Sequence, residues 1–259
     1  MRPVKRWAIG AALLSAACSP VAAPPPPAEA VRATQALCRP QFVLDGKRLE
    51  AGTGFLLTLD GRTVLATAHQ LFGPTGGAPQ QVSAPDLPQR VSGMTCAPFD
   101  GRGAWSAGAA IPVPDAHPSG MPVRYRDVAV FPVPPTGGAL DGTKPLRLAA
   151  RSPRKGDTVW LVAPHVRGAP AGRRLHAARI DTITPRVLAV VFEDEGLDLL
   201  DVGGAPFVDA AGDVVGTMVA TGKLRLTGQV TGYANSLGAL RQAFADAGLV
   251  GEGAGPAGG

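Results

Sequence analysis

Residues 200–206 read Leu-Asp-Val-Gly-Gly-Ala-Pro and lead into two short apolar runs, 206–208 and 213–220. The segment 209–212, Asp-Ala-Ala-Gly, predicts a hairpin turn between the two runs. A glycine-rich turn that enters a hairpin can present one side chain and two backbone N–H groups to a bound carbonyl group. At Gly203, where that side chain would stand, there is only a hydrogen atom. The stretch therefore predicts a carbonyl-binding loop that carries no reactive group of its own.

The composition outside this stretch favours an all-β protein. The chain has 259 residues, of which 45% are hydrophobic, and it contains 34 Gly and 26 Pro, which suits short strands joined by tight turns. Leu59-Asp60-Gly61-Arg62 predicts a further hairpin turn. Such a series of short strands indicates a barrel or a sandwich. We expect strands at 41–44, 54–59, 63–68, 128–133, 158–162, 177–183, 187–192, 206–208, 213–220 and 229–234.

The domain is expected to span residues 36–249 in two strand-rich halves. Prolines and glycines at 134–138 mark the boundary, which gives halves of about 36–135 and 136–249. Strands between 73 and 120 are not assigned, because that region has little hydrophobic periodicity. Ser236 predicts the cap of a short C-terminal helix, with Leu240, Phe244 and Ala247 on one face, and a disordered glycine-rich tail is expected at 250–259.

The first 17 residues have the pattern of an export signal, with basic residues followed by an apolar run from Trp7 to Ala17. Leu14 to Cys18 resembles a bacterial lipoprotein box, although Ser15 departs from the branched aliphatic residue that is usual there. An ordinary signal peptide is the alternative. We expect an exported protein, either periplasmic or anchored to the outer membrane by a lipid at Cys18, and otherwise secreted. Residues 18–35, rich in proline and small residues, predict a semi-extended tether.

The charge gives little support to a nucleic-acid partner. The formal net charge is +5, and without Arg2, Lys5 and Arg6 it becomes 22 minus 20, or +2. No basic helix or tract of interleaved arginine and aromatic residues is present in the sequence. Cys38 and Cys96 can form a disulfide in an oxidising compartment, or they can be two buried thiols. The sequence leaves that choice open.

Two further segments suit acid–base chemistry. The run Val64-Leu65-Ala66-Thr67-Ala68 ends in His69, which predicts a histidine at a strand end that faces a cleft. Asp127 opens the apolar run 128–133. An imidazole base needs a carboxylate that holds its tautomer and stabilises the imidazolium. Taken alone, His69 also fits a structural role and Asp127 a turn residue.

Together these segments resemble the trypsin-like serine proteases of the chymotrypsin fold, in particular a bacterial branch. Members of this branch carry G-T-G-F, T-A-H, D-x-A-V and G-x-S-G-A-P in that order. The corresponding segments here are 52–55, 67–69, 127–130 and 201–206. The resemblance extends from about Cys38 to Leu249, and 146–149 with 156–160 looks like the start of a second barrel. It implies two six-stranded antiparallel β-barrels with a short C-terminal helix.

The resemblance also implies roles for individual residues. His69 matches the general base, Asp127 the residue that orients it, and Gly203 the nucleophile. Asp201 falls where the family has the glycine whose N–H contributes to the oxyanion hole, so the oxyanion-hole region comprises Asp201 and Gly203. Without a hydroxyl at 203 no acyl-enzyme can form. A carboxylate at 201 that pointed at the oxyanion would repel it.

No other group offers an obvious replacement for the missing nucleophile. Ser152 and Ser236 lie far from the loop in the alignment, and Thr217 is expected inside a strand. The four histidines show no metal-ligand spacing, and no metal or cofactor is expected. Five carboxylates precede the loop, and in the resembling family this approach lines the specificity pocket, which makes Glu193 and Asp198 candidate pocket residues. A solvated acidic loop is the alternative.

The sequence thus leaves three functional hypotheses. The first is a protease homologue that has lost activity and retains a cleft for a peptide or protein ligand. The second is an active endopeptidase that uses His69 and Asp127 with an unidentified nucleophile or with water. The third is a structural protein of the cell envelope that binds no ligand in the cleft.

Overall fold

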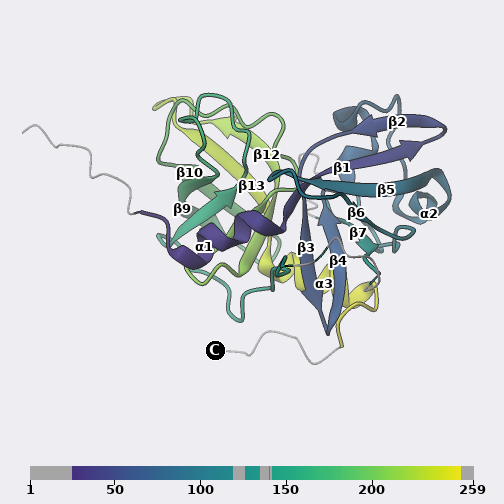
Figure 1. Cartoon of the computed structure of the whole chain (residues 1–259). Coiled ribbons are helices and arrows are strands. Elements are labelled where there is room, and N and C mark those ends of the chain that lie inside the picture. Colours follow the sequence, from purple (N-terminus) through teal and green to yellow (C-terminus); the bar gives the residue numbers. More distant parts are fainter. Residues whose placement is uncertain (1–24, 119–125, 135–139, 141, 252–259) are drawn as a thin grey trace, which may run out of the picture.

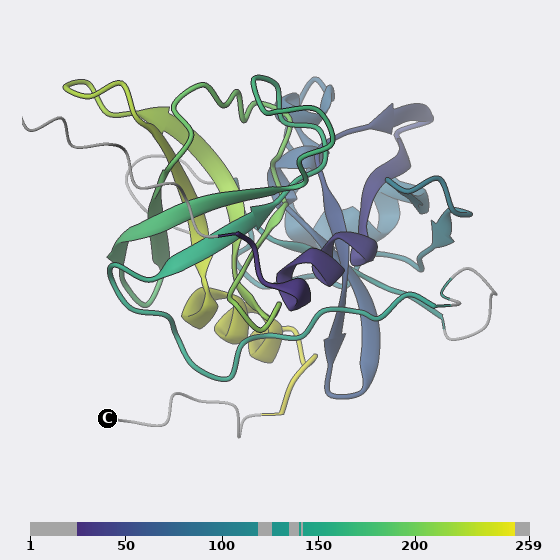
Figure 2. The ribbon, with the colours of Figure 1, turned by 60° about the vertical axis from the view of Figure 1, so that its left-hand side comes forward.

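The computed structural model describes residues 25–118, 126–134, 140 and 142–251. Its strands form two groups that lie side by side (Figure 1), and in a turned view the group of the second half comes forward (Figure 2). The first half contains β1 (Leu37–Leu44), β2 (Lys47–Glu50), β3 (Gly54–Leu59), β4 (Arg62–Thr67), β5 (Val91–Pro98), β6 (Trp105–Ser106) and β7 (Ala129–Pro132). The second half contains β8 (Thr158–Val162), β9 (Leu175–Ile183), β10 (Val187–Phe192), β11 (Pro206–Val208), β12 (Val214–Lys223) and β13 (Val230–Ser236).

The second half is a closed antiparallel barrel in the order β10-β13-β12-β11-β8-β9. Closure gives each of the six strands two neighbours in the ring. Its interior is apolar and is formed by alternate residues of the strands, among them Leu188, Val190 and Phe192 of β10. The predicted all-β class and the six-stranded barrel of this half are therefore confirmed.

The first half is a seven-stranded sheet in the order β6-β5-β1-β3-β4-β7, with β2 paired to β1. The described strands do not close into a ring, so the barrel predicted here is not confirmed. Among the described residues, two single contacts join the segment after β6 to β7: Ile111 forms an isolated bridge with Val130, and Gly108 donates a 2.8 Å hydrogen bond to the carbonyl of Pro132. The prolines and glycines around residue 110 limit this segment to isolated bridges because proline cannot donate to a ladder.

The helices are short. They are α1 (Ala28–Ala33), α2 (Leu87–Arg90) and α3 (Leu237–Asp246), together with 3-10 turns at Thr34–Ala36, His69–Phe72, Pro74–Gly76 and Ala84–Asp86. The predicted cap of α3 is present, because the Ser236 hydroxyl accepts a 3.2 Å hydrogen bond from the Ala239 N–H. Leu240 and Phe244 on α3 pack into the core of the first half. No helix among the described residues is long and apolar enough to cross a membrane.

Part of the predicted tether belongs to the folded domain. Residues 28–36 form α1 and a 3-10 turn, and Ala30 and Ala36 are fully buried. In both views α1 lies in front of the region where the halves meet (Figures 1 and 2). Alanine favours helix and its small side chain allows close packing, which accounts for the difference from an extended tether.

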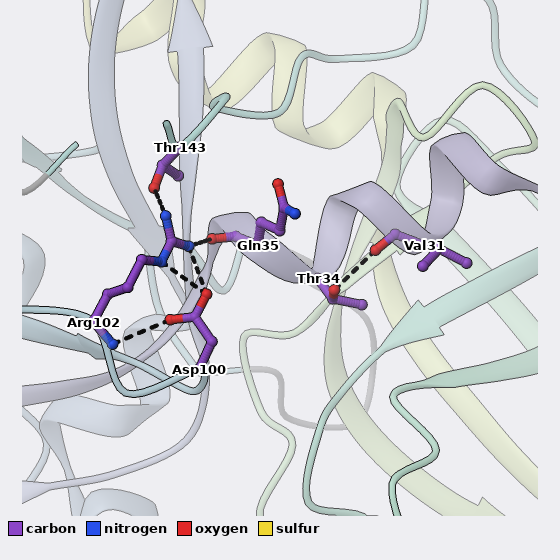
Figure 3. A network of polar contacts seen from close by, with 6 residues as sticks. All are labelled: Val31, Thr34, Gln35, Asp100, Arg102 and Thr143. Atoms are coloured by element: carbon purple, nitrogen blue, oxygen red, sulfur yellow. Dashed lines mark hydrogen bonds and ion pairs between the residues drawn. The ribbon is translucent and has the colours of Figure 1, made fainter. Parts of the chain in front are cut away.

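Arg102 fixes this N-terminal segment to the first half. Its guanidinium group donates to the Gln35 carbonyl at 2.9 Å and to the Thr143 hydroxyl, and it also pairs with Asp100 (Figure 3). On the neighbouring turn the Thr34 hydroxyl donates to the Val31 carbonyl at 2.8 Å (Figure 3). One side chain thus connects the N-terminal helical segment, the loop after β5 and the connection between the halves.

Candidate functional site

A cleft of about 510 Å³ lies between the two halves. It is bordered by the glycine-rich loop at Gly203, by the turn that follows β4, and by the part of β12 from Met218 to Thr221. Leu200 and Asp201 stand at its rim, and Leu200 is 68% exposed. The glycine-rich stretch predicted as a binding loop therefore lines a cleft.

The loop is held in place by the backbone of the first half. The Thr53 N–H donates a 2.9 Å hydrogen bond to the Gly203 carbonyl, and the Thr67 hydroxyl donates a 2.7 Å bond to the Thr53 carbonyl. Gly204 has a φ of +85°, and a Cβ there would stand 2.3 Å from the Thr53 carbonyl oxygen. Glycine is needed at 204 both for this φ and for the close approach of the two chains.

Asp127 lies just before β7 and is completely buried. Its backbone N–H donates to Oδ1 of Asn235 at 3.1 Å, and Nδ2 of Asn235 donates to the Asp127 carbonyl at 2.9 Å. The Asn235 amide also donates to the Thr217 hydroxyl at 2.8 Å. Asn235, which sequence reasoning missed, therefore fixes Asp127 against the second barrel.

His69 does not face the cleft as predicted. It is only 1% exposed, it is not among the residues that line the cleft, and neither ring nitrogen has a hydrogen-bond partner among the described residues. Burial, with a smaller contribution from the charge of His117, lowers the pKa of His69 to about 4, against a small opposing effect of the Val82 backbone. The orienting role that the resemblance implies for Asp127 requires a hydrogen bond from its carboxylate to the His69 ring. Among the described residues the ring makes no such bond.

Gln70, the next residue, faces the cleft instead. Its backbone N–H donates a 2.8 Å hydrogen bond to Oδ1 of Asp127, and its side-chain Nε2 donates a 2.6 Å bond to the Val219 carbonyl. A Cβ atom added to Gly203 would lie 3.5 Å from the same Nε2. Gln70 is therefore the side chain of the first half that lies nearest to position 203 in the cleft.

The side chains of residues 69 and 70 point in different directions because of the backbone conformation after β4. The chain leaves the strand at Thr67 and enters a 3-10 turn at His69–Phe72, where consecutive side chains point in different directions. The His69 carbonyl accepts a 3.1 Å bond from the Gln81 amide. The sequence signal at this site, a histidine after an apolar strand, did not reveal which of the two side chains enters the cleft.

Of the acidic residues before the loop, Asp201 lines the cleft, and Glu193 and Asp198 do not. Asp198 turns away because its carboxylate pairs with Arg167 at 3.0 Å and its backbone N–H bonds the Arg167 carbonyl at 2.8 Å. Asp194 pairs with Arg173. Glu193 and Asp198 therefore do not form a wall of this cleft.

Cys38 of β1 and Cys96 of β5 form a disulfide, which resolves the choice that the sequence left open. The bond joins two adjacent strands of the first half. Cys18 and the predicted signal segment lie outside the described residues. Within the described ranges there is no group of three or more His, Cys, Asp or Glu side chains that could hold a metal ion.

Comparison with solved structures identifies the fold as that of trypsin-like serine proteases. The Rv3671c protease of M. tuberculosis in its active form matches with a TM-score of 0.50 and 21% identity, covering 85% of each chain. The thermostable serine protease AL20 from an extremophilic microorganism matches with a TM-score of 0.53 and 14% identity, over 84% of this chain and 99% of that one.

Neuropsin, a serine protease of mouse brain, matches with a TM-score of 0.53 and 14% identity, over 80% of this chain and 92% of its own. No family model matches the sequence, and a search of curated proteins found no match. At these identities the likeness concerns the fold.

Proposed function

We propose that this protein is a trypsin-like serine protease homologue without peptidase activity, which uses its cleft to hold a peptide segment. The observation that carries the proposal is the pair of residues in the cleft, Gly203 beside Gln70. Glycine has no hydroxyl that could attack a carbonyl carbon, and an amide side chain does not accept a proton near neutral pH. The residues at the expected nucleophile position and beside it therefore supply neither a nucleophile nor a base.

Peptide binding is supported by the shape of β12 beside the cleft. β11 pairs with β12 only between Val214 and Thr217, whereas β12 continues to Lys223. Residues 218–221 then form a wall of the cleft, where Met218 exchanges hydrogen bonds with the backbone of Gly204 and Ala205 and the residues after it are not paired with β11. An extended peptide can add to such an edge through main-chain hydrogen bonds, while neighbouring pockets select side chains.

The activity proposal is tested with a fluorophosphonate probe on the purified natural chain. We expect no covalent label, and no cleavage of casein or of peptide libraries. A labelled protein, or turnover that survives repurification, would support an active endopeptidase and refute the proposal. Trypsin treated in parallel serves as the positive control for the probe.

The binding proposal is tested by calorimetry with a peptide library and two matched leucine variants. Leu200 is 68% exposed at the rim of the cleft, whereas Leu226 is 99% exposed in the β12–β13 connection and does not line the cleft. We expect Leu200→Ala to weaken peptide binding and Leu226→Ala to leave it unchanged. No binding by any peptide, or equal effects of both substitutions, would instead favour a structural protein with an unused cleft.

We also propose that the protein is exported and that a lipid on Cys18 anchors it to a bacterial membrane. The support is the basic and apolar pattern of residues 1–17 followed by this cysteine. Expression with metabolic labelling by a fatty acid should show incorporation that Cys18→Ser abolishes. A protein that is processed and exported without label would show an ordinary signal peptide.

A further inference from the structure

Two adjacent residues, His69 and Gln70, are candidates for the position of a base at this cleft, and their surroundings differ. His69 is the only one of the two with an imidazole, but its ring is buried and lies outside the cleft. Gln70 has its side chain in the cleft and its backbone N–H on the Asp127 carboxylate. A base must lie within hydrogen-bond reach of the group that it deprotonates, so geometry decides between them.

The first reason to place the base at residue 70 is its short distance from a side chain at residue 203. The Gln70 Nε2 atom would lie 3.5 Å from a Cβ at that residue, and a hydroxyl oxygen stands one bond further out. A side chain at 203 could therefore reach hydrogen-bond distance of the group at 70 by rotation about one bond. The second contact of such a Cβ would be Leu71 at 3.7 Å, an ordinary van der Waals distance.

The second reason to place the base at residue 70 is its contact with the carboxylate of Asp127. The hydrogen bond from the Gln70 N–H to Asp127 involves only the backbone, so it does not depend on which side chain residue 70 carries. Asp127 is in turn held by the two hydrogen bonds of its backbone to Asn235. The carboxylate thus stays beside residue 70 when the side chain there is changed.

We propose that residue 70, and not the neighbouring His69, occupies the position of the general base in this fold, and that this chain carries a glutamine there. The inference deepens the proposed loss of activity, on which it rests. A working site needs a nucleophile, a base and a carboxylate. This chain then lacks the first two, because it has Gly203 and Gln70 at those positions. Asp127 is the one that is retained, with a structural role through its contacts to Gln70 and Asn235.

The test measures how fast a fluorophosphonate labels engineered full-length chains. The parent carries Gly203→Ser and Asp201→Gly, so that a hydroxyl is present and the carboxylate at 201 is gone. In the labelling step the hydroxyl oxygen at 203 bonds to phosphorus, fluoride leaves with the electron pair of the P–F bond, and the hydroxyl proton passes to the base. The parent should react slowly, because a glutamine cannot take that proton.

Addition of Gln70→His to the parent should raise the labelling rate on the order of 100-fold, the usual lower range for general-base assistance. His69→Leu added to the parent or to the triple variant should leave each rate unchanged. The inference would be overturned if His69→Leu abolished the reactivity of the parent.

A second base at the same position keeps the test decisive. Gln70→Glu preserves the shape of the side chain, so a rate increase with either substitution supports position 70, and no increase with both overturns it. Thermal unfolding of every variant shows that the fold is intact. Because each rate is compared with that of the parent, failure here is distinct from failure of the proposed function, which concerns labelling of the natural chain and peptide binding.

Discussion

Asn235 on β13 holds Asp127 of the opposite half through two hydrogen bonds that run in opposite directions, at 3.1 and 2.9 Å. Both residues are buried, with exposures of 1% and 0%. The pair connects the first half with the barrel of the second half, and Asp127 also accepts a hydrogen bond from the backbone of Gln70, which lines the cleft. The relative position of the cleft walls therefore depends on a polar contact in the interior.

Asn235→Ala should lower the free energy of unfolding by about 3 kcal/mol. The substitution removes three hydrogen bonds and leaves buried groups of Asp127 and Thr217 without their amide partner, each of which costs about 1–3 kcal/mol. Urea unfolding measures the effect. Gln242→Ala, at an exposed residue of α3 whose side chain donates to Asp246, is the control and should change stability by less than about 0.5 kcal/mol. Equal effects of the two substitutions would contradict the assigned role.

The buried His69 should make stability depend on pH. Its pKa is about 4 in the folded chain, against 6.5 for an exposed histidine, because burial disfavours the imidazolium. Between pH 4 and 6.5 the unfolded chain binds more protons than the folded chain. The free energy of unfolding of the protein therefore falls as the pH drops from 6.5 to 4. The loss attributable to this residue is about 3 kcal/mol.

His69→Leu tests that pH dependence. Leucine removes two buried nitrogen atoms that lack partners among the described residues, so stability at pH 7 should be unchanged or higher. The decline of the free energy of unfolding from pH 6.5 to 4 should become shallower. Part of the decline should remain because burial also lowers the pKa of His176. Denaturant titrations at several pH values measure both effects. An unchanged slope would show that the ring is protonated or solvated in the folded protein.

Gln70→Ala should strengthen peptide binding, provided that the cleft binds peptides as proposed. The Gln70 amide occupies the Val219 carbonyl on the β12 edge, so an incoming peptide N–H must compete with it. Loss of one hydrogen bond of net value about 0.5–1.5 kcal/mol corresponds to a roughly 2- to 10-fold gain in affinity. Calorimetry with Gln80→Ala, an exposed residue outside the cleft lining, provides the comparison. Weaker binding after Gln70→Ala would mean that the amide contacts the ligand.

Gly204→Ala should be strongly destabilising. An added Cβ would meet the Thr53 carbonyl at 2.3 Å in a backbone with φ of +85°. Gly46 provides a matched control because its φ is +81° and a Cβ there meets nothing within 4 Å. Gly46→Ala should cost about 1 kcal/mol for the left-handed backbone alone, and Gly204→Ala clearly more. Similar melting temperatures for the two variants would show that the loop can move away from Thr53.

Much of the strand order could be predicted because apolar runs between turn residues identify buried strands. The expected ranges 54–59, 158–162, 187–192 and 206–208 coincide with β3, β8, β10 and β11. β2 was missed because it is largely exposed and contains three charged residues, Lys47, Arg48 and Glu50. β5 was missed because two adjacent exposed residues, Ser92 and Gly93, interrupt its alternation. Both lack the apolar pattern by which a strand is recognised in a sequence.

The sequence by itself determined the all-β class, the capped C-terminal helix, the glycine-rich loop and the absence of a hydroxyl at Gly203. These features depend on local composition and on residue identity. Only the tertiary structure decided that His69 is buried and that Gln70 enters the cleft. The physical reason is that Asp127 and Val219 orient Gln70, and they lie 57 and 149 residues away along the chain.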